Sequence, residues 1–414
     1  MIVQSIFGLL VFLFVAWLVG ENRRRVAVGT VLGGLGLQVV LGLLLLKLPI
    51  FKGAFLGLNK VILALEEATR AGTSFVFGYL GGGEPPFQEI TPAASYILAF
   101  RGLPLVLLVS ALSSLLFYWR ILPVVVRAFS WALQRTMRIG GAEGFSVASN
   151  VFLGMVESPL VVRPYLKQMT RSEMFSIMTV GMAGVAGTVM VLYASILGPV
   201  VPDALGHILI ASIISAPAGV TVAKLMIPET KPITTGKIIP PVDARSAMDA
   251  ITRGTAEGIQ LLISIVAMVI VLVALVFLVN LGLRLLPEIG GGAVTLQRLF
   301  GYIMAPVMWL VGIPWSECLT AGSLMGTKTV LNELIAYVDM SKVDPALLSD
   351  RSRIILTYAM CGFANPGSLG IMIGGMGAMV PERREEIVAL GLRTILAGTL
   401  ATCMTGAVAA IFIE

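Results

Sequence analysis

The sequence is poor in charged residues. Asp, Glu, Lys and Arg make up 13% of its 414 residues, whereas 57% are hydrophobic. A soluble globular domain is about one quarter charged, so this chain lacks the polar side chains that would cover a water-facing surface. Its long apolar segments also exclude an intrinsically disordered chain. The class that remains is an all-α polytopic membrane protein.

Cysteine and histidine are scarce as well. Cys318, Cys361 and Cys403 lie far apart without a CxxC pair, so neither a disulfide framework nor a zinc site is indicated. His207 is the only histidine, and we interpret it as a residue at a helix end. The net charge of +6 comes without a basic and aromatic patch, so we expect no nucleic acid partner.

Enzyme signatures are missing from the sequence. It contains no Walker A, GxSxG or HExxH pattern, and we expect no catalytic residues, no cofactor and no enzymatic activity. The enzyme alternative that stays open is an intramembrane transferase with Glu157 or Glu333 as its base.

Hydrophobic runs that reach or approach the length of a membrane span are present. A transmembrane helix needs about 20 apolar residues. We expect eight spans, at residues 5–20, 26–46, 102–119, 174–201, 204–223, 259–283, 354–380 and 394–413. An interfacial helix is expected from Asn59 to Ala71.

Basic residues set the expected orientation. Lys and Arg cluster after the first, third, fifth and seventh of these spans. With eight spans the four groups fall on one side of the bilayer, which the positive-inside rule assigns to the cytoplasm. We therefore expect both termini to lie outside, with the lipid bilayer as the surrounding partner.

Residues 141–172 and 299–340 are apolar but interrupted by polar side chains. Each segment is too long for one straight span and too broken for two, so we expect two re-entrant hairpins of opposite orientation. Irregular backbone at membrane depth is tolerated only where protein or a water-filled cavity surrounds it. A glycine-interrupted span follows each hairpin. This repeated order is typical of an inverted-repeat secondary transporter with a site near the midplane.

Polar side chains within these segments are the candidate site residues. The first hairpin carries Glu157, the second carries Asn332 and Glu333, and the last interrupted span carries Asn365 and Ser368 around a Pro-Gly pair. A carboxylate at membrane depth is costly unless it faces a cavity or a partner. An amide beside it both donates and accepts hydrogen bonds. The set therefore suits a ligand rich in hydroxyl groups.

Each of these signals has a structural alternative. The alternatives are a short solvated loop around Glu157, a structural pair of Lys328 with Glu333, and an ordinary proline kink at Pro366. The agreement of the signals in order and spacing favours the transporter.

Three motifs resemble the concentrative nucleoside transporters. The run from Gly326 to Tyr337 is similar to the family's G-x-K-x3-N-E-F-V-A signature. Residues 157–166 resemble the first hairpin of the family, and residues 361–365 resemble its seventh span. The resemblance covers essentially the whole chain.

The resemblance implies a function and a set of binding residues. It implies a homotrimer in the bacterial inner membrane, a secondary active symporter that takes up nucleosides with a cation by an elevator-type movement. The first hairpin and the span after it would face the base, and the second hairpin and seventh span would hold the ribose. The implied substrate-binding residues are Met155, Val156, Glu157, Val189, Glu333, Phe363, Asn365 and Ser368, supported by Asn332 and Lys328. An implied sodium site maps onto Asn150, Leu153, Val156, Gly184 and Val185.

The same resemblance implies scaffold and transport domains. We expect N-terminal scaffold helices with the interfacial helix in residues 1–120, and the first hairpin and following helices of the transport domain in 121–227. A cytoplasmic linker and a long scaffold helix are expected in 228–298. The second hairpin and the last two helices of the transport domain are expected in 299–414.

The sequence departs from the family pattern in two places. Met155-Val156 stands where family members often carry Gln-Thr, and Gly184 stands where sodium-dependent members tend to have a hydroxyl. We therefore expect a more apolar base site with broad or purine-tolerant selection. The sodium shell loses two side-chain oxygens, whereas a proton needs only a carboxylate that accepts it. Proton symport is therefore favoured, with Glu333 and then Glu157 as carriers, and sodium symport is the alternative.

Overall fold

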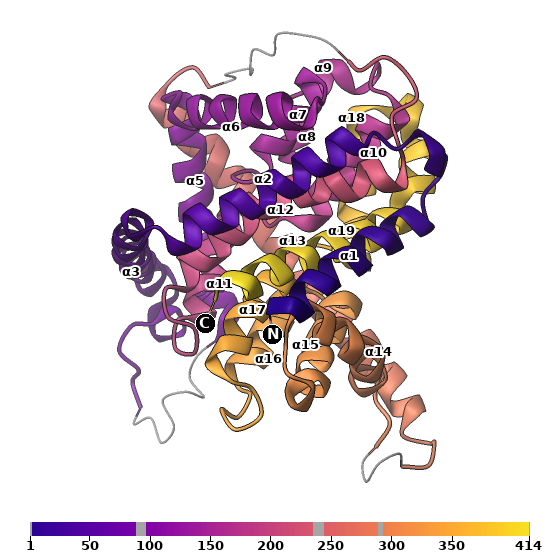
Figure 1. Cartoon of the computed structure of the whole chain (residues 1–414). Helices are drawn as coiled ribbons and strands as arrows, with labels where there is room; N and C mark the ends of the chain where they lie inside the picture. The colour runs from indigo at the N-terminus through magenta and orange to yellow at the C-terminus, as the bar shows by residue number, and fades with distance from the viewer. Residues whose placement is uncertain (1, 88–96, 235–243, 289–292, 414) are drawn as a thin grey trace.

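Helices form all the regular secondary structure in the part of the chain that the computed structural model describes, residues 2–87, 97–234, 244–288 and 293–413 (Figure 1). The expected all-α class is confirmed for these residues. Six described stretches are long and apolar enough to cross a membrane: Val28–Lys47, Leu98–Tyr118, Arg171–Leu197, Ala204–Met226, Ala247–Leu283 and Pro381–Phe412.

The two other expected spans have a different form. The first corresponds to α1 (Ile2–Leu18), which is an apolar helix of 17 residues. The seventh is divided into α17 (Asp350–Met360) and α18 (Pro366–Met379). Pro366 removes a backbone N–H and is tolerated as the first residue of a helix, so the chain begins a new helix there.

The N-terminal helices pack against elements from both later parts of the chain. α2 (Val28–Lys47) contacts α12 (Ala204–Met226) and α19 (Arg384–Phe412), and α1 contacts α12, α14 (Leu296–Val311) and α19. α3 (Pro49–Phe77) is longer than the interfacial helix expected from Asn59 to Ala71. The remaining short elements here are η1 (Arg23–Arg25), η2 (Gly78–Gly81) and α4 (Leu98–Arg101).

A close helix pair is formed by α5 (Leu105–Tyr118) and α13 (Ala247–Leu283). Gly254 and Gly258 of α13 face α5, and a Cβ atom at Gly254 would lie 2.6 Å from the carbonyl oxygen of Ser110. Small residues spaced by four let membrane helices approach closely. Elsewhere along α13 apolar side chains are exposed on its surface, among them Ile263, Ile270 and Phe277.

The order of elements in residues 121–226 is repeated in residues 296–412. Each part has one helix, a pair of short helical arms joined by a tip, a divided helix and a long helix. The first part comprises α6 (Ile121–Met137), α7 (Gly141–Ser149), α8 (Glu157–Leu160), α9 (Arg163–Leu166), α10 (Arg171–Ala183), α11 (Gly187–Leu197) and α12. The second comprises α14, η4 (Trp315–Glu317), α15 (Cys318–Val330), α16 (Glu333–Ser341), α17, α18, η5 (Pro381–Arg383) and α19. We call residues 150–156 the first tip and residues 331–332 the second tip.

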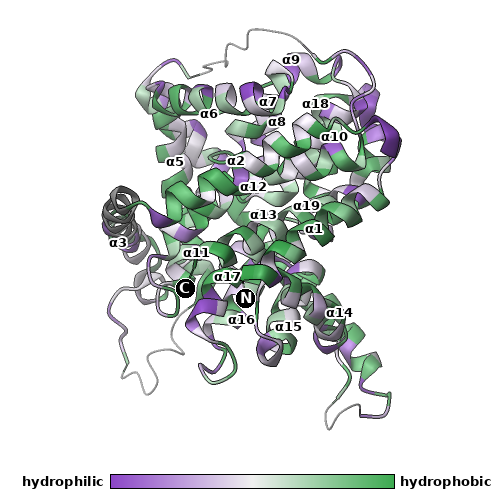
Figure 2. Ribbon diagram, viewed as in Figure 1, coloured by the Kyte–Doolittle hydropathy of each residue, from purple (hydrophilic) through white to green (hydrophobic). Residues whose placement is uncertain are grey.

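The two divided helices meet at their breaks. The backbone N–H of Phe363 donates to the carbonyl oxygen of Gly184 over 3.3 Å. A Cβ atom at Gly362 would lie 2.9 Å from the carbonyl oxygens of Met182 and Ala183, so only glycine permits this approach. The core around the crossing is built from α10, α12 and α19. Hydrophobic residues dominate this middle part, and hydrophilic ones gather toward the upper and lower ends (Figure 2).

The two described ends of the chain lie close together, as Figure 1 also shows. The Gln4 side chain donates to the carbonyl oxygen of Ile313 over 3.0 Å. Arg351 donates to the carbonyl oxygens of Gly312 and Ile413, each over 3.2 Å. The start of α1 and the end of α19 therefore meet the same turn after α14, on one side of the molecule.

Candidate functional site

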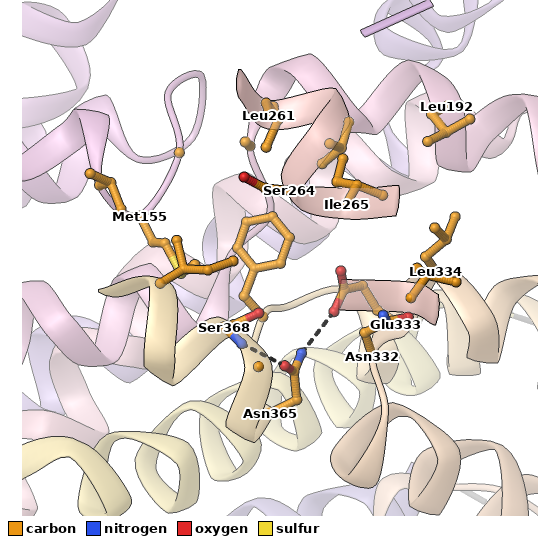
Figure 3. A pocket seen from close by; sticks show the side chains of 18 of the residues that line it. Met155, Leu192, Leu261, Ser264, Ile265, Asn332, Glu333, Leu334, Asn365 and Ser368 are labelled. Atoms are coloured by element: carbon orange, nitrogen blue, oxygen red, sulfur yellow. Dashed lines mark hydrogen bonds between the residues drawn. The ribbon is translucent and has the colours of Figure 1, made fainter. Parts of the chain in front are cut away.

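A cavity of about 840 Å³, counting the space at its mouth, lies where the two tips and the two breaks face α13 (Figure 3). It is lined by all eight residues expected to bind substrate: Met155, Val156, Glu157, Val189, Glu333, Phe363, Asn365 and Ser368. The fold thus brings together side chains from segments more than 200 positions apart. We call this space the first cavity.

Two asparagines start the helices that carry the polar wall. The Asn332 side chain accepts from the backbone N–H of Ile335 over 2.9 Å and begins α16. The Asn365 side chain accepts from the backbone N–H of Ser368 over 2.8 Å and begins α18. Such caps satisfy N–H groups that a helix start leaves free. They also fix Glu333, the first residue of α16, at a helix end that favours negative charge.

Both carboxylate oxygens of Glu333 accept hydrogen bonds from side chains. The Tyr193 hydroxyl donates to Oε1 over 2.6 Å, and the Asn365 amide donates to Oε2 over 3.2 Å. All three side chains are buried. The two donors hold the Glu333 carboxylate in place, so this arrangement presents a fixed acceptor to the cavity.

Glu157 has different surroundings. It is the first residue of α8 and is exposed to the cavity space. Among the described residues its hydrogen-bond donors are backbone N–H groups, including those of Gly154 and Val156. The Glu157 carboxylate folds back over Gly154 and occupies the space that a side chain there would need. Glu157 therefore lies between the backbone of the first tip and the cavity space.

The remaining walls of the first cavity are largely apolar. Figure 3 shows Leu261, Ser264 and Ile265 of α13 on the side opposite Glu333 and Asn365. The first tip adds Met155, whose side chain is buried. The cavity therefore has one hydrogen-bonding face and one apolar face, which is the usual form of a small-molecule site.

Of the two supporting residues, only Asn332 lines the cavity. Lys328 is completely buried, and its ammonium group has no hydrogen-bond partner among the described residues. No ion pair joins it to Glu333 in the described part of the chain, although the two charges interact at longer range. The structural Lys328–Glu333 pair named as an alternative is thus not formed as a direct contact.

The implied sodium site includes the buried side chain of Asn150. The Asn150 amide donates to the carbonyl oxygen of Val180 over 3.0 Å, and its side-chain oxygen accepts from Ser158 over 3.4 Å. Gly184 packs directly beside it, where a Cβ atom would lie 2.7 Å from the Asn150 amide nitrogen. Leu153, Val156 and Val185 bring no side-chain oxygen, so Asn150 alone supplies one.

Other candidate ligand residues have ordinary partners. His207 lies in the first turn of α12, as expected, with its Nδ1 atom 2.8 Å from the Tyr358 hydroxyl. The three cysteines are free and buried. In the described ranges, no group of three or more His, Cys, Asp or Glu side chains is placed to hold a metal ion.

Sequence reasoning missed Tyr193 and the wall contributed by α13. Tyr193 follows the first break by seven residues, and its hydroxyl in an apolar helix was a usable signal because such a group needs a partner. The α13 side chains Leu261, Ile265, Val269 and Leu272 gave no signal, since aliphatic residues facing lipid and those facing a cavity look alike.

Comparisons with known proteins agree along the chain. Residues 7–80 and 207–410 match the models of the Na+ dependent nucleoside transporter N-terminus and C-terminus, and residues 99–200 match the nucleoside recognition model called Gate. The nucleoside permease NupC of Helicobacter pylori is 34% identical over 99% of this chain and 97% of its own length. An uncharacterized transporter of Haemophilus influenzae is 37% identical over 100% of this chain and 98% of its own.

Solved structures of CNTnw have the same fold. Its inward-facing substrate-bound state matches with a TM-score of 0.90 at 33% identity, over 100% of this chain and 98% of that one. An outward-facing variant of CNTnw matches with a TM-score of 0.89 over 99% of this chain and 97% of that one. With these relatives matched over nearly their whole lengths, the chain belongs to the concentrative nucleoside transporter family.

Proposed function

We propose that the protein is a secondary active symporter that takes nucleosides into the cell with a coupling cation across the bacterial inner membrane. The observation that carries this proposal is the two-sided first cavity. Hydrogen-bonding groups of Glu333, Asn365 and Ser368 line one face, and the largely apolar wall of α13 lines the other. Glu157 adds a carboxylate at the edge of the cavity, beside Leu261. A nucleoside has the same two parts, a sugar with hydroxyl groups and a planar base.

The ribose is the main recognition handle in this proposal. The polar groups are fixed before the ligand arrives, because helix caps and the Tyr193 hydroxyl hold them in place. Such preorganisation lowers the entropic cost of binding. The base lies toward Met155, Val156 and Val189, where no amide reads its polar edge, so selection among bases is broad.

The coupling cation that we favour is the proton. The Asn150 side chain is engaged with Val180 and Ser158, and residues 156 and 184 carry no hydroxyl. Sodium prefers several oxygen ligands, so this shell is weak for it. The two carboxylates differ as carriers: Glu333 has both oxygens bonded by side-chain donors, whereas Glu157 is exposed to the cavity and free of them in the described residues. This contrast favours Glu157, rather than the Glu333 preferred from the sequence, as the group that exchanges a proton.

The proposed movement is of the elevator type within a homotrimer. The two arm pairs would be re-entrant hairpins of an inverted repeat, and they would carry the polar face of the first cavity past α13. Since α13 supplies only the opposite wall, the ligand could stay bound during the movement. The α5–α13 pair would belong to the scaffold, whereas the packing of α1 and α2 on α12 and α19 favours their moving with the transport domain. Both termini would lie outside.

The test is uptake of radiolabelled uridine and adenosine by the purified protein in proteoliposomes. A proton gradient without sodium is compared with a sodium gradient at constant pH. We expect saturable uptake that a proton gradient stimulates and that free uracil, adenine or ribose inhibits only weakly. Competition by a free base as strong as by its nucleoside would overturn the ribose assignment. Stimulation by sodium alone would overturn proton coupling.

A further inference from the structure

A second cavity, of about 1130 Å³ with its mouth, lies beside the first. It is enclosed by α5, the start of α13 and the other side of the first tip. The two cavities share three lining residues, Gly154, Glu157 and Leu261. They are therefore neighbours, with the Glu157 carboxylate and the Leu261 side chain at their junction.

The second cavity has the chemistry of the first. Hydroxyl groups come from Ser110, Ser113 and Ser114 of α5, and Glu257 of α13 adds a carboxylate. Aromatic rings are also present in its wall, from residues Phe117, Tyr118 and Phe152. A hydroxyl-rich sugar attached to a planar ring finds both kinds of partner here, as it does around Glu333 and Phe363.

The two cavities lie one after the other along α13. The first uses α13 residues from Leu272 back to Leu261, and the second continues from Leu261 to Arg253. At the rise of an α-helix these 19 steps span about 28 Å, close to the thickness of the hydrocarbon core. The second cavity extends to Tyr118 and Ala244, beside the basic residues Arg120 and Arg245. It thus leads toward the side that the positive-inside rule assigns to the cytoplasm.

We infer that the second cavity is a second, weaker binding station for nucleosides on the path between the first cavity and the basic-loop side. The inference rests on the proposed function and assigns to Ser113, Ser114 and Glu257 a part in substrate passage. Glu157 belongs to both stations. A sugar hydroxyl therefore keeps one hydrogen bond to Glu157 while its other partners change from Glu333 and Asn365 to the serines.

Stepwise exchange has an energetic reason. Leaving a buried acceptor unpaired is costly, so a ligand that broke all its hydrogen bonds at once would face a high barrier to release. Because Glu157 lines both cavities, the ligand can exchange its hydrogen bonds in two steps, and each step has a lower barrier than a single release. The second station holds the ligand less tightly, because Ser113 and Ser114 are only partly buried and Arg253 is already paired with Asp249 over 3.1 Å.

The experiment uses single introduced cysteines and a membrane-impermeant maleimide. The three native cysteines are buried, so labelling reports the introduced thiol. S264C lies in the first cavity alone and S113C in the second alone. T252C, on an exposed position of α13 that lines neither cavity, is the matched control. Labelling rates of the full-length protein are measured in inverted membrane vesicles with increasing uridine or adenosine.

Two protection curves are expected. Nucleoside slows the labelling of S264C at low concentration and of S113C at a concentration several-fold higher, and it leaves T252C unaffected. E257Q moves the S113C curve to higher concentration without moving the S264C curve. Protection of S113C that follows the S264C curve, or no protection of S113C, would overturn the second station while leaving the proposed function intact. Loss of S264C protection together with absent uptake would instead refute the proposed function.

Discussion

The Tyr193 hydroxyl donates a hydrogen bond of 2.6 Å to Glu333, although the two residues lie 140 positions apart. Tyr193 lies on the second half of the first divided helix, and Asn365 begins the second half of the other. Glu333 begins the second arm of the second pair. Three helices that begin in the interior therefore converge on one carboxylate.

Removing the Tyr193 hydroxyl should weaken nucleoside binding. In Y193F the Glu333 carboxylate loses a donor and its fixed position, and hydrogen bonds to charged groups contribute about 1.5–3 kcal/mol. We expect the nucleoside concentration for half-maximal uptake to rise about tenfold or more. Y337F is the matched control, because the Tyr337 hydroxyl donates to Thr357 and not to Glu333. Equal effects of both variants on half-saturation would contradict this role.

The two carboxylates should respond differently to neutralisation. E333Q should lower nucleoside affinity strongly, because the glutamine amide donates where an acceptor is needed. E157Q should remove the stimulation of uptake by a proton gradient, because a glutamine carries no exchangeable charge. Uptake against imposed pH gradients, with counterflow as the measure of binding, separates the two effects. A full proton response in E157Q would show that Glu157 is not the carrier.

The first tip should set base preference. Met155 is buried beside Gly181, and Val156 packs on Gly375. M155Q with V156T adds an amide and a hydroxyl with little change in volume. We expect the ratio of uridine to adenosine uptake to rise several-fold in the double variant. An unchanged ratio in a variant that still transports would mean that these side chains do not touch the base.

Packing of α5 on α13 should depend on Gly254. In G254A the new methyl group meets the Ser110 carbonyl at 2.6 Å, and overpacking of this kind costs about 1–3 kcal/mol. G282A is the control on the same helix, since a Cβ atom there meets nothing within 4 Å. We expect a thermal midpoint several degrees lower for G254A and no loss for G282A. Equal midpoints would argue against close packing at Gly254.

Acid should weaken a contact between the α1–α2 connection and two other helices. Burial acts to raise the pKa of Glu21, but the hydrogen bonds and charges of Arg171 and Arg393 outweigh it and hold the pKa below its ordinary 4.5. Because the folded state lowers this pKa, the stabilisation is present above pH 4.5 and is lost as the pH falls below it.

The matched variant for this contact is E21Q. Because Glu21 is partly exposed, we expect its loss to cost about 1 kcal/mol or less at pH 7 and nothing once Glu21 is protonated. Thermal midpoints of both proteins between pH 7 and pH 3.5 should therefore converge at low pH. A constant difference across that range would contradict the assignment.

Much of the site was predictable because polar groups in lipid are costly. Glu157, Glu333 and Asn365 stand out from apolar sequence, and Pro366 marks the start of a helix in the interior. The three polar residues line one cavity in the fold. The first break, at residues 184–186, has no proline, and only its glycines suggested it.

The rest depended on contacts that composition does not encode. α3 is longer than the helix expected from Asn59 to Ala71. The residues before and after that stretch are also helical, and their sequence pattern did not show where the helix begins and ends. The pairing of Tyr193 with Glu333 and the wall from α13 arise only when distant segments pack. Neither leaves a periodic pattern in the sequence.

The division of the first cavity into a polar face and an α13 face has a pharmacological consequence. If the polar face moves past α13 as proposed, the part of the ligand that contacts α13 must be able to move along that helix. A nucleoside analogue with a rigid apolar arm directed at Leu261 and Ile265 would keep the hydrogen bonds of its sugar to the polar face. Its arm would at the same time hold that face in place against α13. Such an analogue would bind tightly and inhibit transport without being transported itself.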